Sequence, residues 1–186
     1  DAAAIVEAVH EPVLHELAER GTPFIGLLYA GIMLTEDGPQ VLEFNCRFGD
    51  PETQAILPRL DGDLLGTLAA AAAGDLAEST VRVSDDAAVT VVMAGRDYPA
   101  RSDVGTAIRG LEDAEAQGAV VFHAGTALRN GRLVTNGGRI LDVTATGPTI
   151  ADARARAYSA AEKIVFDGAR YRTDIAVEAA DGAPVG

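Results

Sequence analysis

The stretch VLEFNCRFGDPET, residues 41–53, is the most informative part of the sequence. It begins with a strict alternation of apolar and polar side chains, which is typical of a β-strand with two different faces. The apolar face carries Leu42, Phe44 and Cys46. The polar face carries Glu43, Asn45 and Arg47. We therefore expect a strand whose apolar face, Cys46 included, is buried in a core and whose polar face holds chemically useful groups.

The polar face offers a carboxylate, an amide oxygen and a guanidinium in a row, because side chains two residues apart on a strand lie about 7 Å apart on one side. Magnesium binds hard oxygen ligands and takes only one or two from the protein when phosphate oxygens and water complete its shell. Glu43 and Asn45 are therefore candidate magnesium ligands, and Arg47 is a candidate for binding a phosphoryl group. The alternative is that all three are solvent-facing residues of a half-buried strand, and spacing alone favours that alternative.

The residues before this strand predict a helix followed by a hairpin. Apolar side chains spaced by three and four residues indicate an amphipathic helix over residues 2–20, kinked or split at Pro12. Two apolar runs, residues 24–35 and the run that begins at Gln40, are separated by the turn-forming residues 36–39. This pattern is typical of an antiparallel hairpin.

The residues after it predict two helices and then a second domain. Residues 52–60 and 63–73 have helical composition, and Gly74 closes the second helix. The polar, aperiodic segment 77–86 is the expected boundary between a domain of residues 1–80 and a domain of residues 87–186. The fold class is therefore α+β.

The second domain is expected to be a small antiparallel sheet covered by a helix. Turn signals separate five candidate strands, which are residues 88–93, 119–123, 127–128, 132–135 and 140–145. Asn136, Gly137 and Gly138 predict a hairpin turn with positive φ. Thr149 and Asp152 resemble a capping box that opens the final helix, whose alanines and Ile164 pack on the sheet.

Charge and composition exclude several classes of function. The 15 basic residues against 28 acidic ones give a net charge of −13, the opposite of the basic surface that nucleic-acid binding needs. No apolar run approaches the roughly 20 residues of a membrane-spanning helix. The single cysteine cannot form an internal disulfide. We expect a cytoplasmic protein with neither nucleic acid nor membrane as a partner.

Four segments resemble one family. LYAGIML (residues 28–34) and LEFNCRFGDPETQ (residues 42–54) resemble the signature region of the phosphoribosylamine-glycine ligases, in the ATP-grasp superfamily. VFHAGT (residues 121–126) and VTNGGRIL (residues 134–141) resemble two segments of the small β domain of that family. The resemblance covers most of the chain. It implies the C-terminal half of an ATP-grasp domain followed by a small antiparallel β domain with a helix.

The resemblance also implies roles for individual residues. The positions that match Glu43 and Asn45 bind the Mg²⁺ or Mn²⁺ that bridges the phosphates of ATP, and the position that matches Arg47 lies beside the transferred phosphoryl group as a catalytic residue. The loop from Gly49 to Glu52 would lie near the substrates, with Asp50 or Glu52 meeting the substrate amine. The implied reaction joins glycine to phosphoribosylamine through a glycyl phosphate, with ATP as co-substrate. The family resemblance favours a monomer.

The sequence departs from the family in its lysines. ATP-grasp enzymes hold the nucleotide phosphates with lysines and a glycine-rich loop that precede the segment present here, whereas this chain has the single lysine Lys163, in the final predicted helix. Lys163 is interpreted as a solvated helix residue. We therefore expect the chain to require the N-terminal portion of the same enzyme and to be inactive without it.

Three alternatives stay open. A carrier module of the biotinyl or lipoyl type would need a lysine on a hairpin turn, and no predicted turn carries one. A non-catalytic scaffold or interaction fragment would keep the strand without its chemistry. Another ATP-grasp carboxylate-amine ligase is disfavoured by the FGDPET segment, residues 48–53.

His10 and His15 do not have the spacing of a helical metal pair, and His123 is interpreted as structural.

Overall fold

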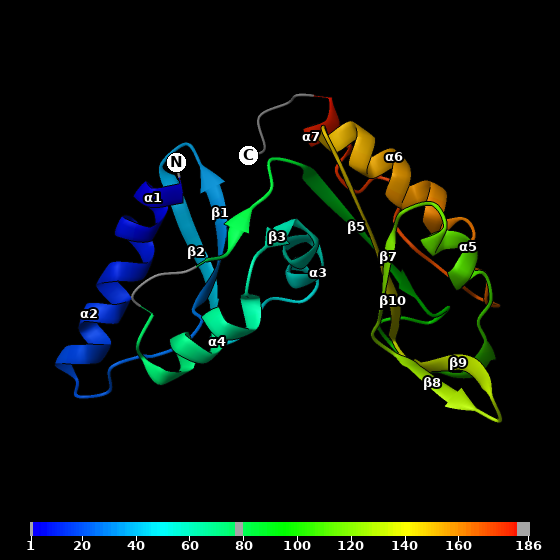
Figure 1. Ribbon diagram of the computed structural model, residues 1–186, viewed down its shortest axis with the longest axis horizontal. Helices are drawn as coiled ribbons and strands as arrows, with labels where there is room; N and C mark the ends of the chain where they lie inside the picture. The colour runs from blue at the N-terminus through cyan, green and yellow to red at the C-terminus, as the bar shows by residue number, and fades with distance from the viewer. Residues whose placement is uncertain (1, 77–79, 182–186) are drawn as a thin grey trace. The chain divides into compact units, whose positions relative to one another are not determined.

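The computed structural model describes residues 2–76 and 80–181 of the chain (Figure 1). Among these, the residues up to 50 and those from 60 to 82 form one compact unit, and the residues from 51 to 59 and from 83 onwards form a second. Helices and antiparallel sheets are mixed in the chain, so the expected α+β class is confirmed. The predicted domain limits, 1–80 and 87–186, stay a prediction.

The first unit begins with a helical segment that is divided near its middle. It comprises α1 (Ala2–Ile5), the π-helical turn η1 (Val6–His10) and α2 (Glu11–Glu19). Pro12 lies in the first turn of α2 and has no N–H to donate to the preceding turn. The N–H of Glu11 instead bonds to the carbonyl of Val6, five residues back. The predicted interruption at Pro12 is confirmed as a wider turn within the helix.

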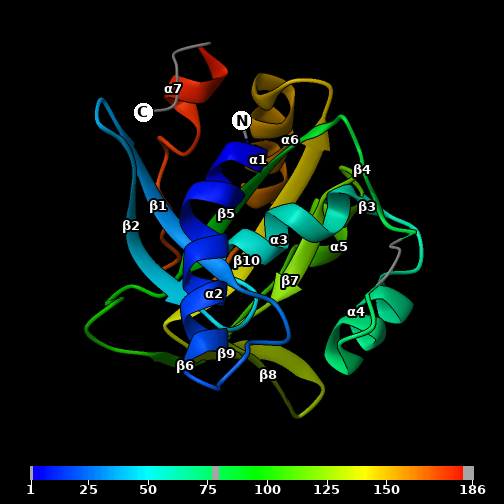
Figure 2. The same cartoon turned by 90° about the vertical axis from the view of Figure 1, so that its left-hand side faces the viewer.

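An antiparallel hairpin follows, formed by β1 (Tyr29–Thr35) and β2 (Gly38–Asn45) and clearest in Figure 2. The register shifts between Gly31 and Ile32: Gly31 pairs with Glu43, and Ile32 pairs with Val41. Leu42 is therefore an extra residue in β2, which makes a β-bulge. Strict alternation along residues 41–47 is interrupted at this point.

The predicted burial of the apolar face of β2 is wrong. Leu42 is 67% exposed, Phe44 is 37% exposed, and Cys46 is exposed rather than part of a core. The reason lies in the size of the layer, because two strands and one helix bury little apolar surface. Phe44 still contacts the ring of His10 edge-on, with the ring centroids 6.3 Å apart.

Several further elements follow the hairpin in the sequence. They are α3 (Glu52–Ile56), the 3₁₀ turn η2 (Leu57–Arg59), β3 (Leu60–Asp61), α4 (Leu64–Ala73) and β4 (Arg82–Val83). Asp63 caps α4 by accepting a hydrogen bond from the N–H of Gly66, and Gly74 ends it in the left-handed conformation. Both predicted helices are therefore present. No helix in the described ranges is long and apolar enough to cross a membrane.

The second unit contains two three-stranded antiparallel sheets, not the single sheet that was predicted. The first has the order β5-β10-β7, with β5 at Ala87–Ala94, β7 at Val120–His123 and β10 at Arg139–Gly147. The second has the order β6-β9-β8, with β6 at Asp103–Ala107, β8 at Thr126–Arg129 and β9 at Arg132–Gly137. Strand β6 and helix α5 (Leu111–Glu115) were not predicted, because glycines and charged residues obscure their periodicity.

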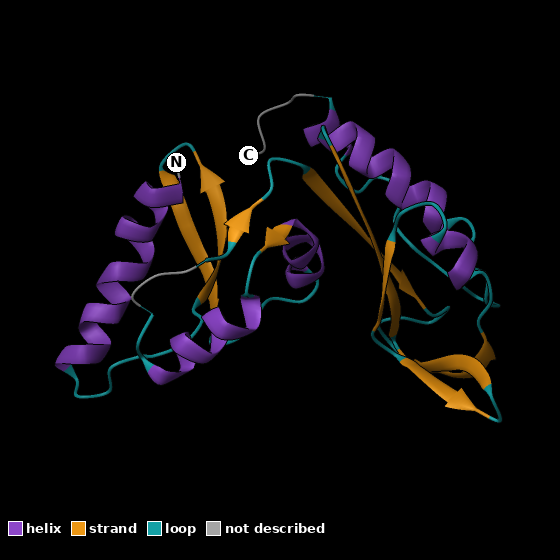
Figure 3. Ribbon diagram, viewed as in Figure 1, coloured by secondary structure: helices purple, strands orange, loops and turns teal. Residues whose placement is uncertain are grey.

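The core of the second unit lies between the first sheet and helix α6 (Ile150–Ala161), which runs along that sheet in Figure 3. Ala153, Ala157, Ala160 and Ala161 are fully buried, as predicted. Their small side chains let the helix approach the sheet closely. Thr149 accepts a hydrogen bond from the N–H of Asp152 over 3.1 Å, which confirms the predicted cap. A short helix, α7 (Val177–Ala180), follows.

The glycines between β9 and β10 serve a different purpose from the one predicted. Neither Gly137 nor Gly138 has positive φ. A Cβ on Gly137 would instead come within 2.9 Å of the Cα of Gly125, where the two backbones pass close together. A turn with positive φ lies instead at Asn130 and Gly131, between β8 and β9.

Candidate functional site

The polar pair at the end of β2 is joined directly. The side-chain amide of Asn45 donates a hydrogen bond from Nδ2 to Oε1 of Glu43 over 2.9 Å. The second carboxylate oxygen of Glu43 and the amide oxygen of Asn45 do not take part in that bond. Two hard oxygen donors from neighbouring side chains are what a Mg²⁺ or Mn²⁺ ion takes from a protein when phosphates supply its other ligands. The donor set of the pair therefore fits the metal that the family resemblance implies.

Gly31 makes room for the Glu43 side chain. The two residues are cross-strand partners in the hairpin. A Cβ placed on Gly31 would come within 3.2 Å of Cγ of Glu43, closer than an ordinary van der Waals contact. Sequence reasoning did not single out Gly31. The available signal was a glycine inside an otherwise apolar strand, which often marks a bulge or a close approach.

The bulge at Leu42 immediately precedes this pair. Bulges increase the local twist of a strand and change the direction of the side chains that follow. Glu43 and Asn45 come after the extra residue and remain two apart in the strand. They therefore share a face even though the alternation predicted for residues 41–47 is broken.

The other three predicted residues lie outside β2. Arg47 follows the strand and donates a hydrogen bond from Nη1 to the carbonyl of Phe48 over 2.6 Å, within its own loop. Asp50 is exposed and is the last residue of that loop in the first unit. Glu52 is exposed at the start of α3, in the second unit. Among the five predicted residues, Glu43 and Asn45 are joined by a hydrogen bond between their side chains. The functional roles of all five stay predictions.

Clusters of three or more His, Cys, Asp or Glu side chains suited to a metal ion do not occur in the described part of the chain. A closed metal site made only of protein ligands is therefore not what residues 2–76 and 80–181 provide. A site with one carboxylate and one amide needs fewer protein ligands, because in such sites phosphate oxygens and water complete the shell of the ion.

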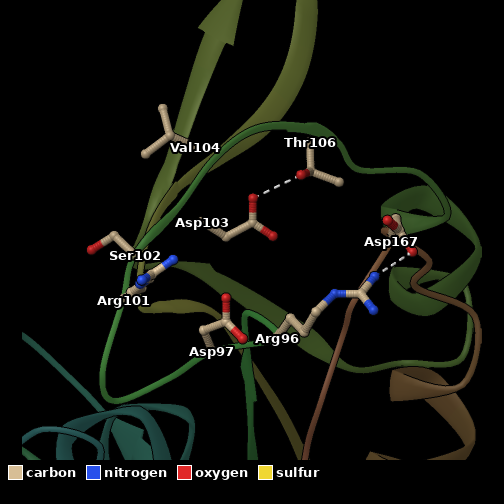
Figure 4. Close-up of a pocket in the computed structure, with 8 residues that line it drawn as sticks. All are labelled: Arg96, Asp97, Arg101, Ser102, Asp103, Val104, Thr106 and Asp167. Carbon is tan, nitrogen blue, oxygen red and sulfur yellow. Dashed lines mark hydrogen bonds and ion pairs between the residues drawn. The ribbon is translucent and has the colours of Figure 1, made fainter.

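A separate pocket of about 250 Å³ opens in the second unit (Figure 4). Its lining is Arg96, Asp97, Arg101, Ser102, Asp103, Val104, Thr106 and Asp167. Arg96 pairs with Asp167 over 2.8 Å, and the hydroxyl groups of Thr106 and Thr135 donate to Asp103 over 2.7 and 3.0 Å. Much of its charge is thus engaged within the protein, and none of the five predicted residues lines it.

His123 and Lys163, interpreted from the sequence as structural and as solvated, lie in the second unit. Nδ1 of His123 lies 2.9 Å from the hydroxyl oxygen of Thr126, across the connection between β7 and β8. This contact supports the structural interpretation of His123. Lys163 is exposed in the turn that follows α6, one residue beyond its C-cap.

Comparisons with known proteins identify what the chain resembles. The model of the phosphoribosylglycinamide synthetase ATP-grasp (A) domain matches residues 1–53, and the model of the C domain of the same enzyme matches residues 88–178. The phosphoribosylamine-glycine ligase of Streptomyces coelicolor is 51% identical over 180 residues, 95% of this chain and 43% of the relative. That of Mesorhizobium japonicum is 49% identical over 169 residues, 91% of this chain and 40% of the relative.

Two more distant comparisons agree. The trifunctional purine biosynthetic protein adenosine-3 of Homo sapiens is 47% identical over 94% of this chain and 17% of its own length. The crystal structure of a phosphoribosylamine-glycine ligase from Thermotoga maritima superposes with a TM-score of 0.81 at 36% identity, covering 93% of this chain and 42% of that one. The chain thus spans 40% and 43% of the length of the Mesorhizobium and Streptomyces ligases.

Proposed function

Because the chain belongs to the phosphoribosylamine-glycine ligase family, we propose that it forms the C-terminal part of an ATP-grasp ligase that joins glycine to 5-phosphoribosylamine. The observation that carries the proposal is the hydrogen-bonded pair of Glu43 and Asn45. It lies within the segment that matches the ATP-grasp domain model. The relatives named as ligases match 91 and 95% of the chain.

In the proposed reaction, the carboxylate of glycine attacks the γ-phosphorus of ATP, and the bond from that phosphorus to ADP breaks. Glycyl phosphate and ADP result. The amine nitrogen of phosphoribosylamine then attacks the glycyl carbonyl carbon and loses a proton, and phosphate leaves. The products are glycinamide ribonucleotide, ADP and phosphate.

Glu43 and Asn45 are proposed to hold a divalent cation, Mg²⁺ or Mn²⁺, at the polyphosphate of ATP. When bound, such an ion neutralises phosphate charge and fixes the phosphate oxygens in place. Within the protein, Gly31 leaves the space that the Glu43 side chain occupies. Asn45 orients Glu43 by donating to one of its oxygens.

Arg47 is proposed as the catalytic cation beside the transferred phosphoryl group. A guanidinium group stays protonated and presents a planar set of donors that suits phosphate oxygens. The bond from Arg47 to the carbonyl of Phe48 uses one of its donor groups. The remaining N–H groups are the ones assigned to the phosphoryl group and to the glycyl phosphate.

Asp50 and Glu52 are proposed as substrate-binding residues, one or the other of which contacts the substrate amine. Both carboxyl groups are exposed on either side of Pro51. A carboxylate near an amine stabilises its protonated form and can accept the proton released during attack. The substrates of the proposed enzyme are therefore glycine, phosphoribosylamine and ATP.

The proposed active form also requires the N-terminal portion found in the relatives, because the nucleotide-binding lysines expected of the superfamily are not supplied by Lys163. We further infer that the enzyme acts in the cytoplasm as a monomer.

The competing proposal is that the chain is a non-catalytic fragment. The sequence has the single lysine Lys163, and this favours the competing proposal because ATP-grasp enzymes are expected to hold the phosphates of ATP with lysines.

Isotope-labelled glycine separates the two proposals. The longest reading frame that contains this sequence, and this chain alone, would each be incubated with ATP, phosphoribosylamine and ¹³C-glycine. We expect labelled glycinamide ribonucleotide by mass spectrometry from the longer protein, and from this chain only after an N-terminal portion is added. Absence of labelled product under every combination would favour the non-catalytic fragment.

A further inference from the structure

Helix α3 is held to the sheet of the second unit through a buried carboxyl group. Nε2 of Gln54 donates a hydrogen bond to Oδ2 of Asp142 over 2.8 Å, which joins residues 88 positions apart in the sequence. Asp142 is only 1% exposed and lies in β10, the central strand of its sheet. Losing a hydrogen-bond partner costs a buried polar group more than an exposed one, because water does not replace the lost partner.

The face of the sheet that carries Asp142 is the one opposite α6. Leu141 and Val143 belong to the hydrophobic core that α6 completes. Since side chains alternate along a strand, Asp142 and Thr144 point to the other face. The hydroxyl groups of Thr144 and Thr90 are 2.8 Å apart on that face. Helix α3 and turn η2 contact β5 and β10, so they form the second layer on this sheet.

A second pair of hydrogen bonds holds the other end of the same segment. Nη2 of Arg59 donates to the carbonyl of Ser84 over 2.9 Å, and the N–H of Ser84 donates to the carbonyl of Arg59 over 2.7 Å. Residues 51–59 are thus attached at Gln54 and at Arg59. This attachment explains why the segment belongs to the second unit although the chain before and after it belongs to the first.

Anchoring Gln54 also fixes the direction of Glu52. Side chains two positions apart in a helix, such as Glu52 and Gln54, are separated by about 200° around its axis. A helix that turns Gln54 towards the sheet therefore turns Glu52 away from it. Glu52 is accordingly exposed, whereas Gln54 is partly buried. We propose that Asp142 is a positioning residue of the ligase, which holds α3 through Gln54 and thereby places Glu52 for the substrate amine. The role of Glu52 in this inference rests on the proposed function.

Hydrogen exchange tests the attachment without any assay of activity. In the protein made from the full reading frame, Asp142→Ala is expected to lower the protection of the α3 amides about tenfold, as the loss of one buried hydrogen bond implies. Protection of α6 should stay unchanged. Gln54→Ala provides the same test without altering the core strand. Thr144→Val is the matched control, because it removes a buried hydroxyl from the same face of β10 and leaves Gln54 and Asp142 intact.

Kinetics test the positioning role. Asp142→Ala is expected to raise KM for phosphoribosylamine, or to lower kcat, by about tenfold, with KM for ATP unchanged. Asp142→Asn should restore both the exchange rates and the kinetics, since its amide oxygen still accepts the bond from Gln54. Equal effects of Asp142→Ala and Thr144→Val, or an equal change in KM for ATP, would overturn the inference.

The two proposals fail in different ways. A wild-type protein without ligase activity would overturn the proposed function and the role of Glu52, whereas the exchange rates would still decide whether Asp142 holds α3. An active protein whose α3 protection and kinetics are the same in the wild type and in Asp142→Ala would overturn the positioning role alone.

Discussion

Gly31 lies directly across the hairpin from Glu43, and a Cβ on Gly31 would stand only 3.2 Å from Cγ of that side chain. The position of the candidate metal ligand therefore depends on the absence of a side chain on the neighbouring strand. This relationship, together with the bond from Asn45, gives the proposed site two structural supports that can be changed separately.

Gly31→Ala should displace the Glu43 side chain by a few tenths of an ångström and raise the Mg²⁺ concentration needed for half-maximal ADP formation. The melting temperature should stay near the wild-type value, because Glu43 is exposed and can move. Met33→Ala is the control, because Met33 is exposed and lies on β1, the strand of Gly31. Equal Mg²⁺ requirements in Gly31→Ala and in the wild type would show that the close approach has no functional role.

Asn45→Ala removes both an oxygen donor and the hydrogen bond that orients Glu43. Loss of a group that orients a metal ligand typically costs 10- to 100-fold in affinity, so we expect the Mg²⁺ requirement to rise by about tenfold or more. Titrating Mg²⁺ at fixed ATP measures this. Gln40→Ala, exposed on the same strand, should behave as the wild type, and the metal assignment would be wrong if the two variants were alike.

Thr149→Ala removes the side chain that caps α6. A lost N-cap destabilises a protein by about 1 kcal/mol, so the free energy of unfolding in urea should fall by that amount. Ser159→Ala, an exposed position in the same helix, should change it much less. If Thr149→Ala and Ser159→Ala both unfolded with the wild-type free energy, the cap would make no contribution to stability.

Arg172 donates two hydrogen bonds to the carboxylate of Asp174, at 2.8 and 2.7 Å. The side-chain hydrogen bond from Arg172 lowers the pKa of Asp174 below its ordinary value. Any stability from this pair is therefore present above the pKa of a free aspartate and is lost as the pH falls through the lowered pKa. Arg172→Gln should raise the pKa of Asp174, measured by NMR titration of its carboxyl carbon, and an unchanged titration would contradict the pairing.

Local patterns predicted much of the fold. Pro12, Gly74, and the cap formed by Thr149 and Asp152 each carry a backbone preference that is independent of distant contacts, and all three mark element boundaries as expected. Strand β6 was missed because Gly105 and Asp103 disturb its periodicity. The two sheets could not be told from one, since strand pairing depends on residues far apart in the sequence.

The candidate site was predicted in its residues but not in its surroundings. Spacing placed Glu43 beside Asn45, and the hydrogen bond between them agrees with that placement. The exposure of Cys46 and Leu42 was missed because alternation tells which residues share a face but not whether anything covers it. The bond from Gln54 to Asp142 was missed for a similar reason, since nothing in either segment points to the other.

The most direct test of the proposed function is ADP formation by the full reading frame containing this sequence, with the wild type compared with Glu43→Gln and Glu36→Gln. Glu36 lies in the turn of the same hairpin and is exposed. We predict ADP formation that requires both glycine and phosphoribosylamine, abolished by Glu43→Gln and preserved by Glu36→Gln. Full activity in Glu43→Gln, or ADP formation that ignores glycine, would contradict the account.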